Sequence, residues 1–123
     1  MLVRASSGSG GGGSVYSLSN AKVVGKSTGL PATFNVGAEK ADYMSIVNMT
    51  NYASLNVGDT VDLCDSSQLP NPNGIGHIVH IDGNSMEYVG NTSNWTASYS
   101  SGSLTLSISG GGSGLNLLLL RVG

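Results

Sequence analysis

The stretch that decides the fold is Leu115-Asn116-Leu117-Leu118-Leu119-Leu120-Arg121-Val122, the most apolar run in the chain. It has the length of a β-strand and is far shorter than the roughly 20 residues that a membrane-spanning helix needs. Side chains alternate between the two faces of a strand, so a nearly continuous apolar run predicts a strand buried on both faces. In a two-sheet sandwich whose outer sheet faces are exposed to water, Leu118 and Leu120 would be exposed. Either another layer of this chain or another subunit must cover them, and we expect a subunit.

The rest of the chain divides into short apolar or alternating segments with turn signals about every ten residues, which is typical of an all-β sandwich or barrel. Residues 104–108 alternate most cleanly, and residues 42–49 are apolar on both sides, which favours a central position. Asp82-Gly83-Asn84 is a strong hairpin signal. The sequence therefore predicts a single small antiparallel β-sandwich or barrel, jelly-roll-like, over residues 15–123. Upstream of the final run, the expected strands are 15–24, 32–36, 42–49, 60–64, 77–81, 86–89, 95–99 and 104–108.

Residues 1–14 form a Gly/Ser-rich arm ahead of this domain. The apolar-basic tip, Met1, Leu2, Val3 and Arg4, is followed by Ser-Ser-Gly-Ser-Gly-Gly-Gly-Gly-Ser, which has the composition of a flexible linker. We expect the tip to dock on a neighbouring subunit. The alternatives are that the arm packs on its own domain, or that the Gly/Ser run is an expression linker.

The composition favours a protein of an assembled particle over a free enzyme in solution. Only 10% of the residues are charged and the formal net charge is −2, so electrostatic self-repulsion is weak. Nothing in this balance indicates nucleic acid or an anionic membrane as a partner. Cys64 is the only cysteine, which excludes an internal disulfide. The N-terminal residues lack the apolar core of a signal peptide, so we expect synthesis in a cytoplasm without membrane insertion.

Two motifs look like ligand sites and are better explained otherwise. Val24-Gly25-Lys26-Ser27-Thr28 resembles the end of a phosphate-binding loop, but Asn20 stands where that loop needs glycine. His77 and His80 would point to opposite faces of a strand and so could not share a metal ion. We expect His80 or His77 to be a partly buried, hydrogen-bonded side chain and the other to lie on the surface.

No enzyme, metal or cofactor is predicted. The acidic side chains Asp59, Asp62, Asp65 and Asp82 fit no calcium-binding loop and are interpreted as turn carboxylates. Serines abound, but no Gly-x-Ser-x-Gly elbow or Cys/His pair supplies an activated nucleophile.

An aromatic platform for a sugar is the remaining candidate site. Tyr88, Trp95 and Tyr99 lie on neighbouring predicted strands, and aromatic faces stack on the apolar faces of sugar rings. A small sandwich also needs its few aromatic residues inside, and this core interpretation is favoured. The loop 65–76, rich in Pro, Asn and Gly, is a second candidate contact for a ligand or receptor.

Four stretches carry a resemblance to a known group of proteins: residues 32–37 (Ala-Thr-Phe-Asn-Val-Gly), 43–47 (Tyr-Met-Ser-Ile-Val), 81–85 (Ile-Asp-Gly-Asn-Ser) and the apolar final strand 117–122. On these features the chain resembles the small β-rich proteins of bacteriophage virions, including head-decoration proteins and tail-fibre modules. No active-site residue of such proteins has a counterpart here.

The resemblance implies a non-enzymatic structural protein of the virion, a capsid-decoration or head or tail accessory protein. Its expected partners are copies of itself, for example in a trimer, and other virion proteins. The alternative is a receptor- or glycan-binding module of a phage tail or fibre, with a molecule of the host surface as partner.

Overall fold

The computed structural model describes residues 18–49, 52–65, 75–90, 94–109 and 114–123. This part of the chain contains nine strands and one short 3-10 helix, η1 (Tyr52–Ser54). The strands are β1 (Ala21–Thr28), β2 (Ala32–Asn35), β3 (Ala41–Val47), β4 (Thr60–Val61), β5 (Ile75–Asp82), β6 (Ser85–Gly90), β7 (Trp95–Ser100), β8 (Ser103–Ile108) and β9 (Asn116–Arg121).

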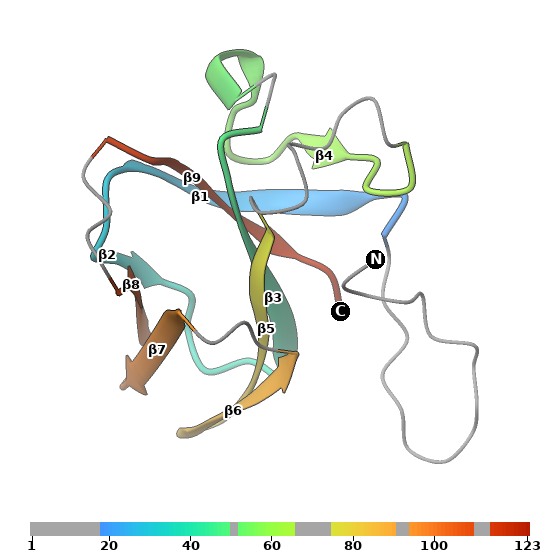
Figure 1. The fold of residues 1–123 in the computed structure, drawn as a ribbon. Coiled ribbons are helices and arrows are strands. Elements are labelled where there is room, and N and C mark those ends of the chain that lie inside the picture. Colours follow the sequence, from blue (N-terminus) through green and yellow to red (C-terminus); the bar gives the residue numbers. More distant parts are fainter. Residues whose placement is uncertain (1–17, 50–51, 66–74, 91–93, 110–113) are drawn as a thin grey trace.

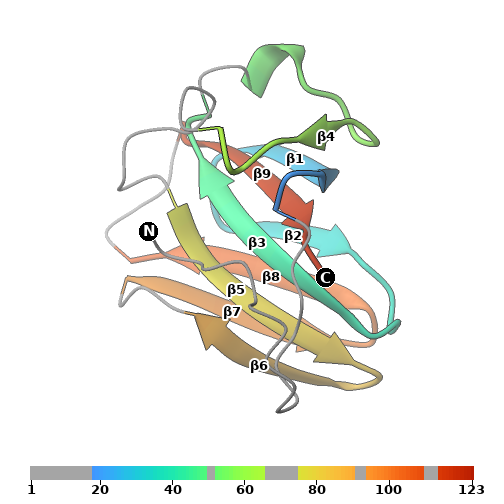
Figure 2. The ribbon, with the colours of Figure 1, turned by 90° about the vertical axis from the view of Figure 1, so that its right-hand side faces the viewer.

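The strands form two antiparallel sheets that pack face to face (Figures 1 and 2). The large sheet has the order β4-β1-β9-β3-β5-β6, and the small sheet has the order β2-β8-β7. The predicted all-β sandwich is confirmed. Because each sheet ends in edge strands that do not pair with the other sheet, the structure is not the closed barrel that the sequence left as the alternative.

β9 lies near the centre of the large sheet, between β1 and β3. The side chains of Leu117, Leu118, Leu119 and Leu120 are all 0% exposed, so the prediction of a strand buried on both faces is confirmed. Leu117 and Leu119 point toward the small sheet and pack in an inner core with residues such as Leu104 and Leu106 of β8 and Trp95 of β7.

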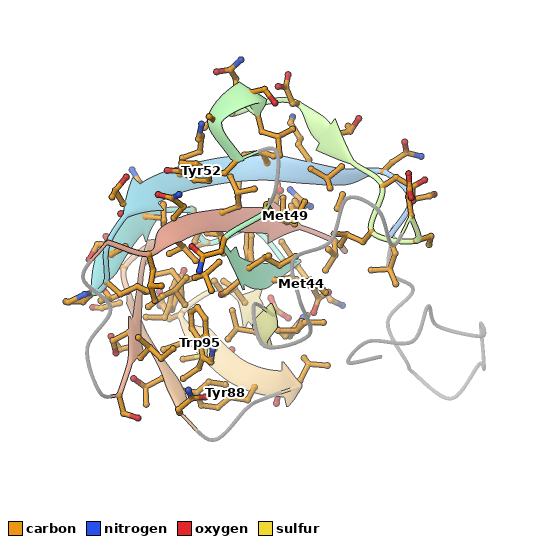
Figure 3. All side chains as sticks on the ribbon, turned by 45° about the horizontal axis from the view of Figure 1, so that its top comes forward. Met44, Met49, Tyr52, Tyr88 and Trp95 are labelled. Atoms are coloured by element: carbon orange, nitrogen blue, oxygen red, sulfur yellow. The ribbon has the colours of Figure 1, made fainter. Side chains whose placement is uncertain are left out.

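Leu118 and Leu120 point to the opposite face of the large sheet, into a second, outer core. That face is covered by Met49 and by residues 52–65, which carry η1 on the side away from the small sheet and continue into the edge strand β4 (Figures 1 and 3). The covering side chains are Met49, Tyr52, Leu55, Val61 and Leu63. The expectation that another subunit covers this face was therefore wrong, because the chain supplies its own third layer.

Lys26 holds this layer in place. Its ammonium group donates hydrogen bonds to the carbonyl oxygens of Tyr52 at 3.0 Å and Leu55 at 2.6 Å, and it lies 4.3 Å from the centre of the Tyr52 ring. The Tyr52 hydroxyl in turn donates to the carbonyl oxygen of Ser27 at 3.2 Å. A short helix with few internal bonds is thus fixed to β1 by a charged side chain and an aromatic one.

The main departure from the predicted boundaries is β1, which begins at Ala21 and continues through Thr28, four residues beyond the predicted end of this strand at residue 24. The extension follows from its partner, because Ser27 and Thr28 pair with Leu117 and Asn116 of β9. Gly25 is required within this strand, since a Cβ atom there would approach Cε1 of Phe34 to 2.6 Å.

Candidate functional site

The three aromatic residues predicted as a sugar platform do not share a surface. Trp95 is 3% exposed and belongs to the inner core, which agrees with the favoured core interpretation. Tyr99 is half-buried, and its hydroxyl shares its single proton between the carbonyl oxygens of Gly37 at 2.9 Å and Gly83 at 2.8 Å. Only Tyr88 is well exposed, at 42% (Figure 3).

Tyr88 connects the adjoining edges of the two sheets. It lies on β6, opposite Val79 of β5, and so points to the inner side of the large sheet. Its hydroxyl accepts a hydrogen bond from the backbone N–H of Ala97 at 2.7 Å and donates to the carbonyl oxygen of the same residue at 3.2 Å. Because β7 is the edge of the small sheet, Tyr88 occupies both backbone groups that an added strand would use at Ala97.

The outer face of the small sheet is uncharged and rich in hydroxyl groups. We call this surface the hydroxyl face, and it consists of Thr33, Asn35, Thr96, Ser98, Ser100, Ser103, Thr105 and Ser107. Cross-strand pairs join the hydroxyls of Thr33 and Thr105 at 2.8 Å and of Thr96 and Ser107 at 2.6 Å. β2, β7 and β8 contain no Asp, Glu, Lys or Arg, so a partner can cover this face without desolvating a charge.

His80 is half-buried and hydrogen-bonded, as predicted for one of the two histidines. Its Nδ1 lies 3.0 Å from Oδ1 of Asp42, a buried carboxyl group on the neighbouring strand β3. His77 lies on the same strand, β5, two positions beyond Ile75. Within the described residues, no group of three His, Cys, Asp or Glu side chains is placed to hold a metal ion.

Two of the acidic residues act as turn carboxylates, as predicted. Asp59 accepts a hydrogen bond from the backbone N–H of Asn56 at 2.8 Å, and Asp62 accepts one from Cys64 at 2.9 Å. These bonds fix the loops on either side of β4. Cys64 is exposed and unpaired with another cysteine.

The segment resembling a phosphate-binding loop is a strand. Its lysine, Lys26, is engaged by backbone carbonyls and the Tyr52 ring, so it is not presented to a ligand. No residue pattern had signalled this structural role, because the two carbonyls come from a segment about 30 residues away.

A further buried ionisable group lies beside the inner core. Burial raises the pKa of the Tyr43 phenol above its ordinary value of 10.0, and the nearby Arg121 guanidinium acts in the opposite direction. Arg121 is itself paired with Glu39, so at least one cation near the end of the chain is paired within the chain.

The predicted partner contacts fall into two groups. Leu118 and Leu120 are fully buried in the outer core and are not surface contacts, a correction that follows from the intramolecular cover described above. Met1, Leu2, Val3 and Arg4, and most of the loop 65–76, lie outside the described residues.

In the part of the chain that the structure describes, no helix is long and apolar enough to cross a membrane. No protein-family model matches the chain, and no curated protein and no solved structure shows significant similarity to it.

Proposed function

We propose that the chain is a non-enzymatic structural protein of a virion, either a capsid-decoration protein or an accessory protein of the head or tail. It would act through contacts with copies of itself and with other virion proteins. The observation that carries the proposal is the uncharged hydroxyl face, which extends to β7, the edge strand of the small sheet.

The physical argument is that a partner can bury the hydroxyl face with a small desolvation penalty. The central parts of protein interfaces are depleted of charged residues, and the small sheet carries none. Hydroxyl groups can exchange water for hydrogen bonds with a partner, so burying them incurs little penalty when those bonds form. The low charge of the whole chain acts in the same direction, because it weakens repulsion between copies.

The alternative function, a receptor- or glycan-binding module, loses the support of an aromatic platform. Trp95 is buried and the Tyr99 hydroxyl is bound to two carbonyls, which leaves Tyr88 as the one well-exposed ring of the three. No observation on the described residues favours this alternative over assembly.

The test is whether the chain is part of a particle. Particles from the cells that express the chain are separated on a density gradient, and an antibody raised against the purified chain locates it. We expect the chain in the particle band, and its exclusive presence among the free proteins would contradict the proposal.

The role of the hydroxyl face is tested in the same gradient. Ser98→Glu places a charge on an exposed position of this face and should lower particle occupancy, whereas Ser19→Glu, at an exposed position ahead of β1, should not. Both variants should keep the unfolding midpoint of the parent, because exposed substitutions change stability little. Equal occupancy of the two variants would argue against this face.

A further inference from the structure

The edge of β7 has the geometry of a strand-docking site. β7 and β8 form a hairpin closed by Ser101 and Gly102, whose φ angles of 49° and 86° fit a type I′ turn. Among the described strands, β7 is paired with β8 alone, and the contact with Tyr88 shows that the N–H and C=O of Ala97 point away from β8. β7 also lacks the charges and prolines that commonly protect an edge from pairing.

The surface beneath this edge is apolar and incompletely covered. The inner side of β6 carries Met86, which is half-buried against the inner core, and Tyr88, which is 42% exposed. A strand added beside β7 would place alternate side chains on these two residues and the others next to the hydroxyl face. The occupant should therefore be a short extended segment without acidic residues that is apolar at least on one side.

The chain itself contains such a segment. Met1-Leu2-Val3-Arg4-Ala5 has Met1, Val3 and Ala5 on one side when extended, and the Gly/Ser run that follows gives it reach. The described chain begins at Leu18, whose carbonyl oxygen accepts a bond from Leu63 just beyond β4. Leu18 therefore lies beside β4, the edge strand of the large sheet opposite to β6.

We propose that Met1–Ala5 of one copy docks as a fourth strand beside β7 of a second copy, and displaces the Tyr88 hydroxyl from Ala97. This inference rests on the proposed assembly function and names one of its partners, a second copy of this chain. In each copy, Tyr88 then acts as an exchangeable cap: its hydroxyl is hydrogen-bonded to the N–H and C=O of Ala97 until the arm of a neighbouring copy replaces it.

The experiment is a disulfide trap between two separately purified chains, both with the native thiol removed by Cys64→Ser. One chain is isotope-labelled and carries Leu2→Cys, and the other carries Ser98→Cys, at an exposed position of β7. Side chains facing the same side of adjacent strands are close enough for a disulfide in a suitable register. After mild oxidation, mass spectrometry should show a mixed disulfide-linked dimer.

The matched control replaces Ser98→Cys with Asn35→Cys, which is exposed on the same face but lies on β2, the other edge of the small sheet. We expect at least several-fold less mixed dimer with this control. Equal yields, no mixed dimer, or a preference for dimers of Ser98→Cys with itself would overturn the proposal. A chain carrying both Leu2→Cys and Ser98→Cys that forms only an internal disulfide would also overturn it.

Tyr88→Phe provides an independent test. It keeps the ring but removes the hydroxyl that competes for Ala97 and with it two hydrogen bonds, so the yield of mixed dimer at subsaturating concentration should rise by at least about fivefold, the effect of one ordinary hydrogen bond. An unchanged or lower yield, with an unchanged unfolding midpoint, would contradict the role of Tyr88 as a cap. These measurements use purified chains, so their failure would leave the particle gradient as a separate test of the proposed function.

Discussion

Truncation of Leu118 measures how well the chain covers the outer face of its own large sheet. The Leu118 side chain is 0% exposed and packs in the outer core together with Met49 and apolar side chains of residues 52–65. Replacing a fully buried leucine by alanine costs about 2–5 kcal/mol, because transfer energy is lost and a cavity is left. If this face were open to water in the isolated chain, the loss would be within about 1 kcal/mol.

The assay is equilibrium denaturation followed by the fluorescence of Trp95, the single tryptophan, which is buried in the fold. Leu117→Ala, on the inner face, is the matched comparison and should destabilise by a similar amount, whereas Val57→Ala, at a position 62% exposed, should have almost no effect. A loss of less than 1 kcal/mol for Leu118→Ala, or one that grows as the protein is diluted, would refute the intramolecular cover.

Three further predictions concern side-chain contacts that stabilise the fold. Lys26→Met keeps the aliphatic stem but removes two charged hydrogen bonds and a cation–π contact, so it should lower the free energy of unfolding by about 1–3 kcal/mol and speed amide exchange in η1. Because burial raises the pKa of Tyr43, the folded chain holds this proton more tightly than the unfolded chain, and stability should fall as the pH rises above 10; Tyr43→Phe should make the denaturation free energy flatter in that range. Gly25→Ala forces a methyl group against the Phe34 ring and should lower the unfolding free energy by about 1–3 kcal/mol, with partial rescue by Phe34→Leu in thermal melts.

Local patterns predicted much of this fold. The alternation in residues 104–108 and the run of four leucines correctly identified β8 and β9, and the Gly83 turn marked the hairpin between β5 and β6. These signals depend on neighbours in the sequence, so they can be read without knowing the tertiary structure. The central position of β3 followed from apolar residues on both of its sides.

The features that were missed depend on contacts between distant segments. Thr28 lies in a strand because β9 pairs with it, although the glycines and proline nearby are typical of a turn. The segment 48–65 carries only a few apolar residues, and nothing local indicates that they cover Leu118 and Leu120. The two hydrogen bonds between the Tyr88 hydroxyl and the backbone of Ala97 join the two sheets, and a tyrosine on an edge strand does not by itself reveal such a contact.

Amide hydrogen exchange at two protein concentrations tests the central claim, that β9 is buried by its own chain and that partners meet the molecule at the edge of β7. We predict that protection of Leu117–Leu120 is the highest in the chain and does not change on dilution. Protection at Ala97 and Tyr99 should rise with concentration, as copies pair along β7. Protection of β9 that falls on dilution, with no change along β7, would contradict the account.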